Sequence, residues 1–153
     1  MDFFEDLEKK GKKDGIMKRI AGGIISNENN EILFLKRKSD DFMGGILELP
    51  SGNVEEKETI DQGLVREVKE ETGLEINKIG IFINAFDYLS RSGKKSRQYN
   101  FEAIVKKSDN IFLTEHDEYR WLSYEEIQKS NEVTDEVKYT ILIYKYNKTR
   151  GVF

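Results

Sequence analysis

Apolar and polar residues follow two different periods along the chain, which predicts a mixture of strands and helices. In the first third, β-rich runs at residues 16–26 and 31–37 surround the turn-forming cluster Asn-Glu-Asn-Asn at 27–30. A shorter run at 46–49 predicts a third strand, which Pro50 stops because proline cannot donate a backbone hydrogen bond to a sheet. This part of the chain is therefore expected to be mostly strand and loop.

Longer runs later in the chain predict two long strands, at residues 76–89 and 98–106. Residues 90–97, which include Ser92-Gly93, are expected to form the hairpin tip between them. Residues 1–15 are charged with few apolar anchors, and we expect either a short amphipathic helix or a loose arm. The remaining expected elements are a loop at 39–45, a strand at 119–122, a helical turn at 124–129 and a terminal helix at 135–148.

Residues 59–72 have the period of an amphipathic helix. Its apolar stripe consists of Ile60, Leu64 and Val68, with Val65 beside it. Gly63 lowers the helix propensity by about 1 kcal/mol relative to alanine, and Gly73 is the usual residue at a left-handed helix stop. Strands combined with two main helices predict an α/β fold, an α/β/α sandwich on a central mixed β-sheet.

Composition narrows the functional classes. The 153 residues carry a formal net charge of −4, so a stable nucleic-acid partner is not expected. The absence of cysteine excludes disulfides, thiolate catalysis and zinc-thiolate sites, and the single histidine excludes a multi-histidine metal cluster. No apolar run approaches membrane-spanning length and the charged N-terminus is unlike a signal peptide, so we expect a soluble cytoplasmic protein. The length fits one domain, assigned to residues 16–153, and leaves a homodimer open.

Three glutamates of the expected helix share one face. Glu67, Glu70 and Glu71 are spaced i, i+3 and i+4, and like charges at this spacing destabilise an isolated helix. A cation between them would reverse the sign of that interaction, and clustered carboxylate oxygens are what Mg²⁺ prefers. Arg66 precedes Glu70 by four residues and could hold one carboxylate in place.

These glutamates belong to a longer pattern. Its fixed residues are Gly52, Glu58, Arg66, Glu67, Glu70, Glu71 and Gly73. Their spacing, G-x5-E-x7-R-E-U-x-E-E-x-G-U with U a bulky aliphatic residue, resembles the Nudix box, so the chain is similar to Nudix hydrolases. At ordinary residue usage the seven positions match by chance about once in 10⁷ starting points. The alternative is a solvated acidic helix, which a highly charged chain could also contain.

The resemblance implies metal-dependent cleavage of a diphosphate linked to a nucleoside, on the same α/β/α fold. Mg²⁺ or Mn²⁺ would neutralise the phosphate oxygens and lower the pKa of a bound water that attacks phosphorus. The implied metal ligands are the Ser51 carbonyl, Glu67, Glu70, Glu71 and Glu115. The implied general base is Glu70, Glu71 or Glu115. Arg66 would orient a glutamate, and Glu58 would support the site from outside.

Residues 42–52 resemble the segment before the box in MutT-type members, which often reads Leu-Glu-Phe-Pro-Gly-Gly; Leu49 and Ser51 depart from it here. The resemblance implies that Glu48 lies near the metal and substrate, the alternative being a carboxylate at the edge of the core. It also implies that Arg37 binds the substrate phosphates, where its planar fork could donate two hydrogen bonds. A solvated basic strand end is the alternative for Arg37.

Residues 114–122 resemble the Glu-x5-Trp element of many Nudix enzymes. Glu115 lies six residues before Trp121 and is favoured over Glu118 as the glutamate that reaches the metals or acts as base. A glutamate that merely stays in water is the alternative. His116 is interpreted as a hydrogen-bonding residue of the loop rather than a catalyst.

The base-reading residue is ambiguous, because either Asn131 or Asp135 resembles the position that reads the purine in MutT-type enzymes. Asp135 could instead cap the last helix. The substrate ranked first is a nucleoside triphosphate, in its ordinary or oxidised form, that yields the monophosphate and pyrophosphate. ADP-ribose or another nucleotide sugar ranks second, and a dinucleoside polyphosphate or capped RNA third. A non-catalytic nucleotide-binding regulator is the alternative outside the enzymes.

Overall fold

The structure is a computed structural model that describes residues 2–41 and 43–151. Residues 1, 42, 152 and 153 lie outside the described residues. The expected segments that include them are therefore described in part; they are 1–15, 16–153, 39–45 and 42–52.

Except for β4, strands and helices follow one another in the order that the sequence pattern predicts. The elements are α1 (Phe3–Lys13), β1 (Lys18–Ile24), β2 (Ile32–Arg37), β3 (Leu47–Glu48), β4 (Ser51–Asn53), α2 (Ile60–Thr72), β5 (Ile76–Leu89), β6 (Lys95–Val105), β7 (His116–Leu122), α3 (Tyr124–Lys129) and α4 (Asp135–Thr149). Thr59 is the N-cap of α2, and Gly73 ends this helix with a φ of 77°. None of the helices in the described ranges has the length and apolar character needed to cross a bilayer.

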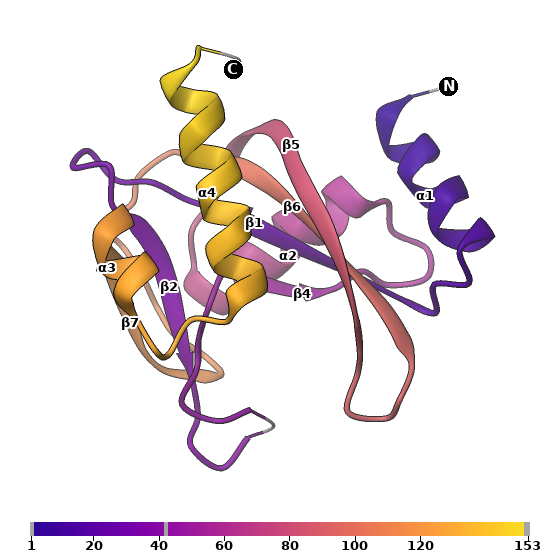
Figure 1. The fold of residues 1–153 in the computed structure, drawn as a ribbon, viewed down its shortest axis with the longest axis horizontal. Coiled ribbons are helices and arrows are strands. Elements are labelled where there is room, and N and C mark those ends of the chain that lie inside the picture. Colours follow the sequence, from indigo (N-terminus) through magenta and orange to yellow (C-terminus); the bar gives the residue numbers. More distant parts are fainter. Residues whose placement is uncertain (1, 42, 152–153) are drawn as a thin grey trace.

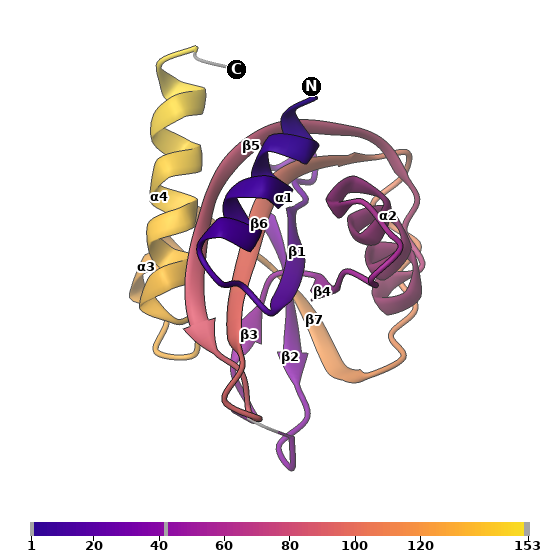
Figure 2. The same ribbon diagram turned by 90° about the vertical axis from the view of Figure 1, so that its right-hand side faces the viewer.

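Two sheets organise the molecule. The mixed sheet has the strand order β4-β1-β6-β5, in which β1 and β6 are parallel and the other pairs antiparallel. An antiparallel sheet has the order β3-β2-β7. In Figures 1 and 2, α2 lies on one face of the mixed sheet and α4 on the other. The predicted α/β fold with a mixed sheet between helices is confirmed.

The core has two halves, one on each face of the mixed sheet. The half under α2 contains the predicted stripe Ile60, Leu64 and Val68, all with no exposed surface. The half under α4 contains Ile141 and Tyr144. Val65 was expected to face the core together with this stripe. That prediction is wrong, because its side chain is 41% exposed and borders the cavity between α1, α2 and β5.

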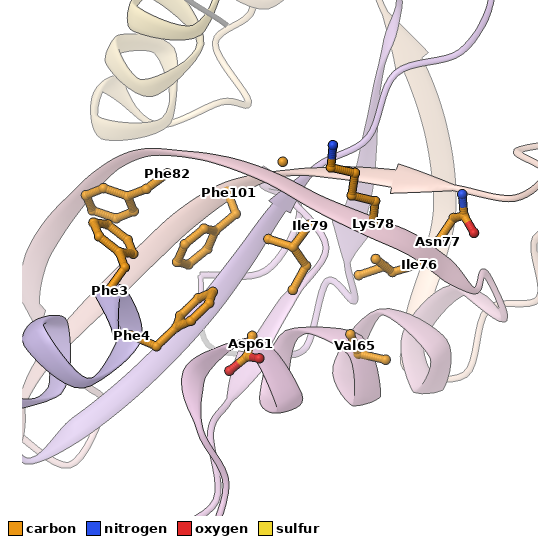
Figure 3. A pocket seen from close by; sticks show the side chains of 11 residues that line it. Phe3, Phe4, Asp61, Val65, Ile76, Asn77, Lys78, Ile79, Phe82 and Phe101 are labelled. Carbon is orange, nitrogen blue, oxygen red and sulfur yellow. The ribbon is translucent and has the colours of Figure 1, made fainter. Parts of the chain in front are cut away.

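The N-terminal helix α1 packs on the sheet through aromatic rings. The ring centroids of Phe3 and Phe82 are 5.4 Å apart, and those of Phe4 and Phe101 are 5.6 Å apart. Figure 3 shows these four rings together at the edge of a cavity of about 450 Å³ between α1, α2 and β5. The N-cap of α1 is Asp2, whose carboxylate accepts a hydrogen bond from the Glu5 amide.

The structure differs from the expected elements at β4, β6 and β7. Strand β4 was not expected, because Ser, Gly and Asn have little β-propensity; it forms by pairing with β1, Ser51 opposite Gly22. Strand β6 starts at Lys95 because the hairpin closes with a tighter turn, in which the Ser90 amide donates to the Lys94 carbonyl. Strand β7 starts at His116 because its pairing with β2 continues past a bulge.

Gly63 generates a first prediction, because a Cβ built on it would lie 2.9 Å from Cγ2 of Val54. Gly63→Ala should lower the free energy of unfolding by about 1–3 kcal/mol through overpacking, although alanine favours the helix by about 1 kcal/mol. Urea denaturation measures this. Val54→Ala provides the matched background, in which the same substitution should cost much less. An equal cost in both backgrounds would show that Val54 is not the cause.

Candidate active site

The guanidinium of Arg66 organises one side of the glutamate cluster on α2. Its Nε and Nη2 donate to the two carboxylate oxygens of Glu58 at 2.6 and 2.8 Å. Its Nη1 donates to Glu67 and to Glu70, both at 3.0 Å, and Nη2 also reaches the Asn53 carbonyl at 2.9 Å. Hydrogen bonding to Arg66 lowers the pKa of Glu58 to about 2. One cation therefore fixes three carboxylates and joins α2 to β4.

Gly52 is required by the close approach of β4 to α2. A Cβ at this position would lie 2.2 Å from Oε2 of Glu67, so any side chain would displace that carboxylate. Glu67 is mostly buried, and burial raises its pKa while hydrogen bonding to Arg66 opposes the rise. The glycine at position 52 thus leaves room for the Glu67 carboxylate against the strand.

Unlike Glu58, Glu67 and Glu70, Glu71 is not paired with Arg66. Its side chain is only 7% exposed, and its carboxylate accepts a hydrogen bond of 2.9 Å from the Ser51 amide. Burial raises the pKa of Glu71 to about 9, and the charges of Glu48, Glu67 and Glu115 act in the same direction. In the part of the chain that the structure describes, no basic side chain forms an ion pair with it. A divalent cation would supply the missing positive charge.

Glu48 lies next to this group at the junction of β3, β2 and β7. Its carboxylate accepts a hydrogen bond from Arg37 Nη1 at 3.1 Å and lies 2.8 Å from His116 Nε2. Arg37 Nη2 also donates to Asp41 at 3.0 Å. Partial burial raises the pKa of Tyr88 on β5, and the negative charge of Glu48 adds to the rise. His116 is a hydrogen-bonding residue as predicted, but it lies at the start of β7 rather than in a loop.

The segment before β7 brings Glu115 to the cluster. The Thr114 hydroxyl donates to the backbone carbonyl of Glu70 at 3.0 Å, which ties the segment to the end of α2. The charge of Glu115 contributes to the raised pKa of both Glu67 and Glu71. Glu118 instead pairs with Lys36 and Arg120. The charge of Glu115 therefore acts on Glu67 and Glu71, whereas Glu118 pairs with basic side chains instead.

Asn131 and Asp135 are not brought into this cluster. Both are exposed, at the loop before α4 and in its first turn. The backbone bond from the Leu47 amide to the Glu132 carbonyl, 2.8 Å, ties the loop to β3. The N-cap of α4 is Thr134, whose hydroxyl accepts from the Val137 amide, so the interpretation of Asp135 as the cap is wrong.

A row of buried amides on the mixed sheet was missed in the sequence. Gln98 donates to Asn100 at 2.9 Å, and Asn100 donates to Asn84 at 3.1 Å. Asn84, Phe86 and Tyr88 alternate along β5, so the amides share a face with the tyrosine that lies near Glu48. The signal was available, since amides at alternate positions of adjacent strands are unusual on a buried face.

The NUDIX domain model matches residues 17–142, which is most of the chain. The chain belongs to the Nudix family. The Nudix box therefore corresponds to β4, α2 and the turn between them. The cavity in Figure 3 and a second one of about 720 Å³, bordered by α3, α4 and β6, are not lined by the box glutamates.

Individual relatives agree with this assignment. The chain is 45% identical over 64 residues to the 8-oxo-dGTP diphosphatase of Escherichia coli (strain K12), covering 42% of this chain and 50% of that protein. It is 52% identical over 52 residues to the ADP-ribose pyrophosphatase of Methanocaldococcus jannaschii, covering 34% of this chain and 30% of that protein. The chain therefore spans half or less of these two curated relatives. The crystal structure of a MutT protein from Methanosarcina mazei Go1 has a TM-score of 0.73, 25% identity, and coverage of 90% of this Nudix chain and 97% of that one.

Glu71 predicts how the stability of the metal-free protein depends on pH. Folding raises its pKa from 4.5 to about 9, so the folded state retains a proton that the unfolded chain releases. The contribution is fully present below about pH 4.5 and is lost as the pH rises towards 9. Glu71→Gln keeps the shape and cannot ionise. In EDTA its melting temperature should exceed that of the wild type by several degrees at pH 8 and by little at pH 5.

Exposed Glu75 is the control, because its pKa is lowered by Lys69 and Lys106 rather than raised by burial. Glu75→Gln should therefore not raise the melting temperature at pH 8. A constant difference between Glu71→Gln and wild type at both pH values would mean that the Glu71 carboxylate is ionised throughout.

Proposed function

We propose that the protein hydrolyses a diphosphate bond in a nucleotide with Mg²⁺ or Mn²⁺ as cofactor. The observation that carries this proposal is the buried carboxylate of Glu71, which lies near Glu48, Glu67 and Glu115 and has no basic partner in the described ranges. Buried charges without a partner strongly destabilise a protein. Divalent cations bind clustered carboxylate oxygens, so a metal site accounts for the arrangement.

Each residue of the box has a role in this proposal. The groups that would hold the cation are the Ser51 carbonyl and the carboxylates of Glu67, Glu70, Glu71 and Glu115. When bound, the ion would neutralise phosphate charge and lower the pKa of a water. Glu70, Glu71 or Glu115 would accept the proton of the attacking water. Arg66 would orient Glu67 and Glu70, and Glu58 would act only through Arg66.

The substrate would complete the metal site. Within the described residues, no three His, Cys, Asp or Glu side chains already form a group that could hold a metal. Glu67 and Glu70 are instead bonded to Arg66. Because Mg²⁺ usually shares its ligands between protein and phosphate, we expect modest metal affinity that improves when a nucleotide is present.

A nucleoside triphosphate, in its ordinary or oxidised form, is the substrate that we place first, with the monophosphate and pyrophosphate as products. It is supported by the similarity to the 8-oxo-dGTP diphosphatase and by the placement of Arg37 on Glu48 beside the carboxylates. Asn131 or Asp135 remains the proposed base-reading residue. The similarity to an ADP-ribose pyrophosphatase supports ADP-ribose as the second candidate.

A Mg²⁺-dependent hydrolysis screen tests the function. The panel contains dGTP, an oxidised dGTP, dCTP and ADP-ribose, with separate detection of pyrophosphate and phosphate. We expect pyrophosphate from a triphosphate, and reversible loss of activity in EDTA. Glu71→Gln and Glu70→Gln should each lower the rate by about 100-fold or more. Glu75→Gln removes the same charge outside the cluster and should have near-normal turnover.

Three outcomes of this screen would count against parts of the proposal. If the protein cleaved only ADP-ribose, the proposed triphosphate substrate would be wrong, but the proposed metal-dependent hydrolysis would stand. Near-normal turnover of Glu71→Gln would refute the role of the carboxylate cluster. Nucleotide binding without turnover of any compound in the panel would favour a regulator.

Arg37 generates a prediction about the phosphates. If its fork binds the diphosphate, Arg37→Ala should lower kcat/KM by about 10- to 100-fold, and Arg37→Lys by less, because lysine keeps the charge without the paired donors. The loss should be similar for all bases in the panel. Asn131→Ala or Asp135→Ala should instead change the preference between purine and pyrimidine substrates.

Arg120→Ala is the matched control, since Arg120 pairs with Glu118 and Glu132 rather than with Glu48. It should leave kcat/KM near the wild-type value. A loss on Arg37→Ala confined to one base would show that Arg37 contacts the base and not the phosphates.

A further inference from the structure

Arg19 on β1 connects the N-terminal helix to the turn that precedes α2. Its Nη2 donates to the Glu55 carbonyl at 2.6 Å, and its Nη1 donates to the Glu58 carbonyl at 3.1 Å. Nη1 also bonds to the carboxylate of Glu8 on α1. The side chains of Arg19 and Glu8 are both largely buried. One guanidinium therefore holds two carbonyls of the turn and is itself held by α1.

The turn of residues 55–58 is where this contact reaches the Nudix box. The Glu58 amide donates to the Glu55 carbonyl at 2.9 Å, and the Glu55 amide donates to the Glu58 carboxylate at 2.8 Å. The backbone is thus folded so that the Glu58 carboxylate faces Arg66, which bonds both of its oxygens. A contiguous set of hydrogen bonds runs from Glu8 through Arg19, Glu58 and Arg66 to the glutamates of α2.

We propose that Arg19, oriented by Glu8, is a positioning residue for the metal-binding carboxylates and acts through the 55–58 turn. The inference rests on the proposed function, since it concerns the same metal site. Arg19 lies outside the box pattern, which begins at Gly52, and touches none of the proposed metal ligands. Partners that orient metal ligands from outside commonly change metal affinity by about 10- to 100-fold when removed.

The structure offers a matched control for the attachment of α1. Asp14, the C-cap of α1, pairs with Arg97 of β6 at 2.9 Å, and this contact does not lead to the box. The rings of Phe3 and Phe4 also hold the helix on the sheet (Figure 3). Glu8→Gln and Asp14→Asn therefore each remove one carboxylate that anchors α1, but only Glu8 is bonded to Arg19.

The experiment measures Mn²⁺ binding to the full chain without nucleotide, by electron paramagnetic resonance, together with thermal melting. Arg19→Ala should weaken Mn²⁺ binding by about tenfold. Arg19→Lys and Glu8→Gln should weaken it less, because each keeps part of the contact. Asp14→Asn should leave Mn²⁺ affinity unchanged even if it lowers the melting temperature. In hydrolysis of the best substrate of the panel, Arg19→Ala should raise the Mg²⁺ concentration required for half-maximal rate.

A double-mutant cycle separates positioning from general destabilisation. If Arg19 acts through Glu58, Arg19→Ala should change Mn²⁺ affinity little in a Glu58→Gln background. Additive effects in the cycle, or Mn²⁺ affinity that falls equally in Asp14→Asn, would overturn the proposal. Should Arg19→Ala not fold, Arg19→Lys and Glu8→Gln provide the same comparison. Because binding is measured without substrate, failure of the hydrolysis screen would refute the proposed function and leave this test standing.

Discussion

The acidic face of α2 depends on the single guanidinium of Arg66. Glu67 and Glu70 face the same side of the helix, and Glu58 approaches them from the preceding turn. Without a cation, three carboxylates at this distance would repel each other and destabilise the part of the helix that carries Glu67 and Glu70. Arg66 compensates for this with five hydrogen bonds, one of which also fixes the backbone of β4. Arg66 therefore fixes both the position of β4 and the orientation of the glutamate side chains.

The cluster contains two kinds of carboxylate, which suits two tasks. Glu58, Glu67 and Glu70 are paired with Arg66 and have defined orientations, although Glu70 remains 59% exposed. Glu71 is buried and, among the described residues, its carboxylate is hydrogen-bonded only to a backbone amide. Burial and the neighbouring glutamates disfavour its ionised form. The three glutamates paired with Arg66 have fixed positions relative to one another. Glu71 provides a buried carboxyl group whose ionised form has no basic partner among the described residues, and a divalent cation would stabilise that form.

Local patterns predicted the parts of the fold that depend on local physics. The apolar spacing and the glycine at position 73 are local features of α2 and its end, so the bounds of this helix were predicted to within one residue. The spacing of the box likewise predicted that Arg66 would hold Glu70. By contrast, β4 exists only because β1 offers a free edge, and the contact between Glu48 and His116 joins segments far apart in the sequence. The Glu8–Arg19 contact and the bond from Asn100 to Asn84 are of the same kind, since each joins residues more than ten positions apart along the chain.

The parallel pairing of β1 with β6 has a consequence for how the chain acquires its structure. Strand β1 lies in the interior of the mixed sheet, and Lys18 to Ile24 pair with Ser96 to Glu102. During synthesis from the N-terminus, β1 therefore has no neighbour on that side until about two thirds of the chain has emerged. The ring of Phe3 likewise lacks its partner until Phe82 has been synthesised, and the ring of Phe4 until Phe101 has been synthesised. Non-local pairing of this type closes late and slowly, so one edge of β1 and the two aromatic rings lack their native partners through much of synthesis, the period in which aggregation is favoured.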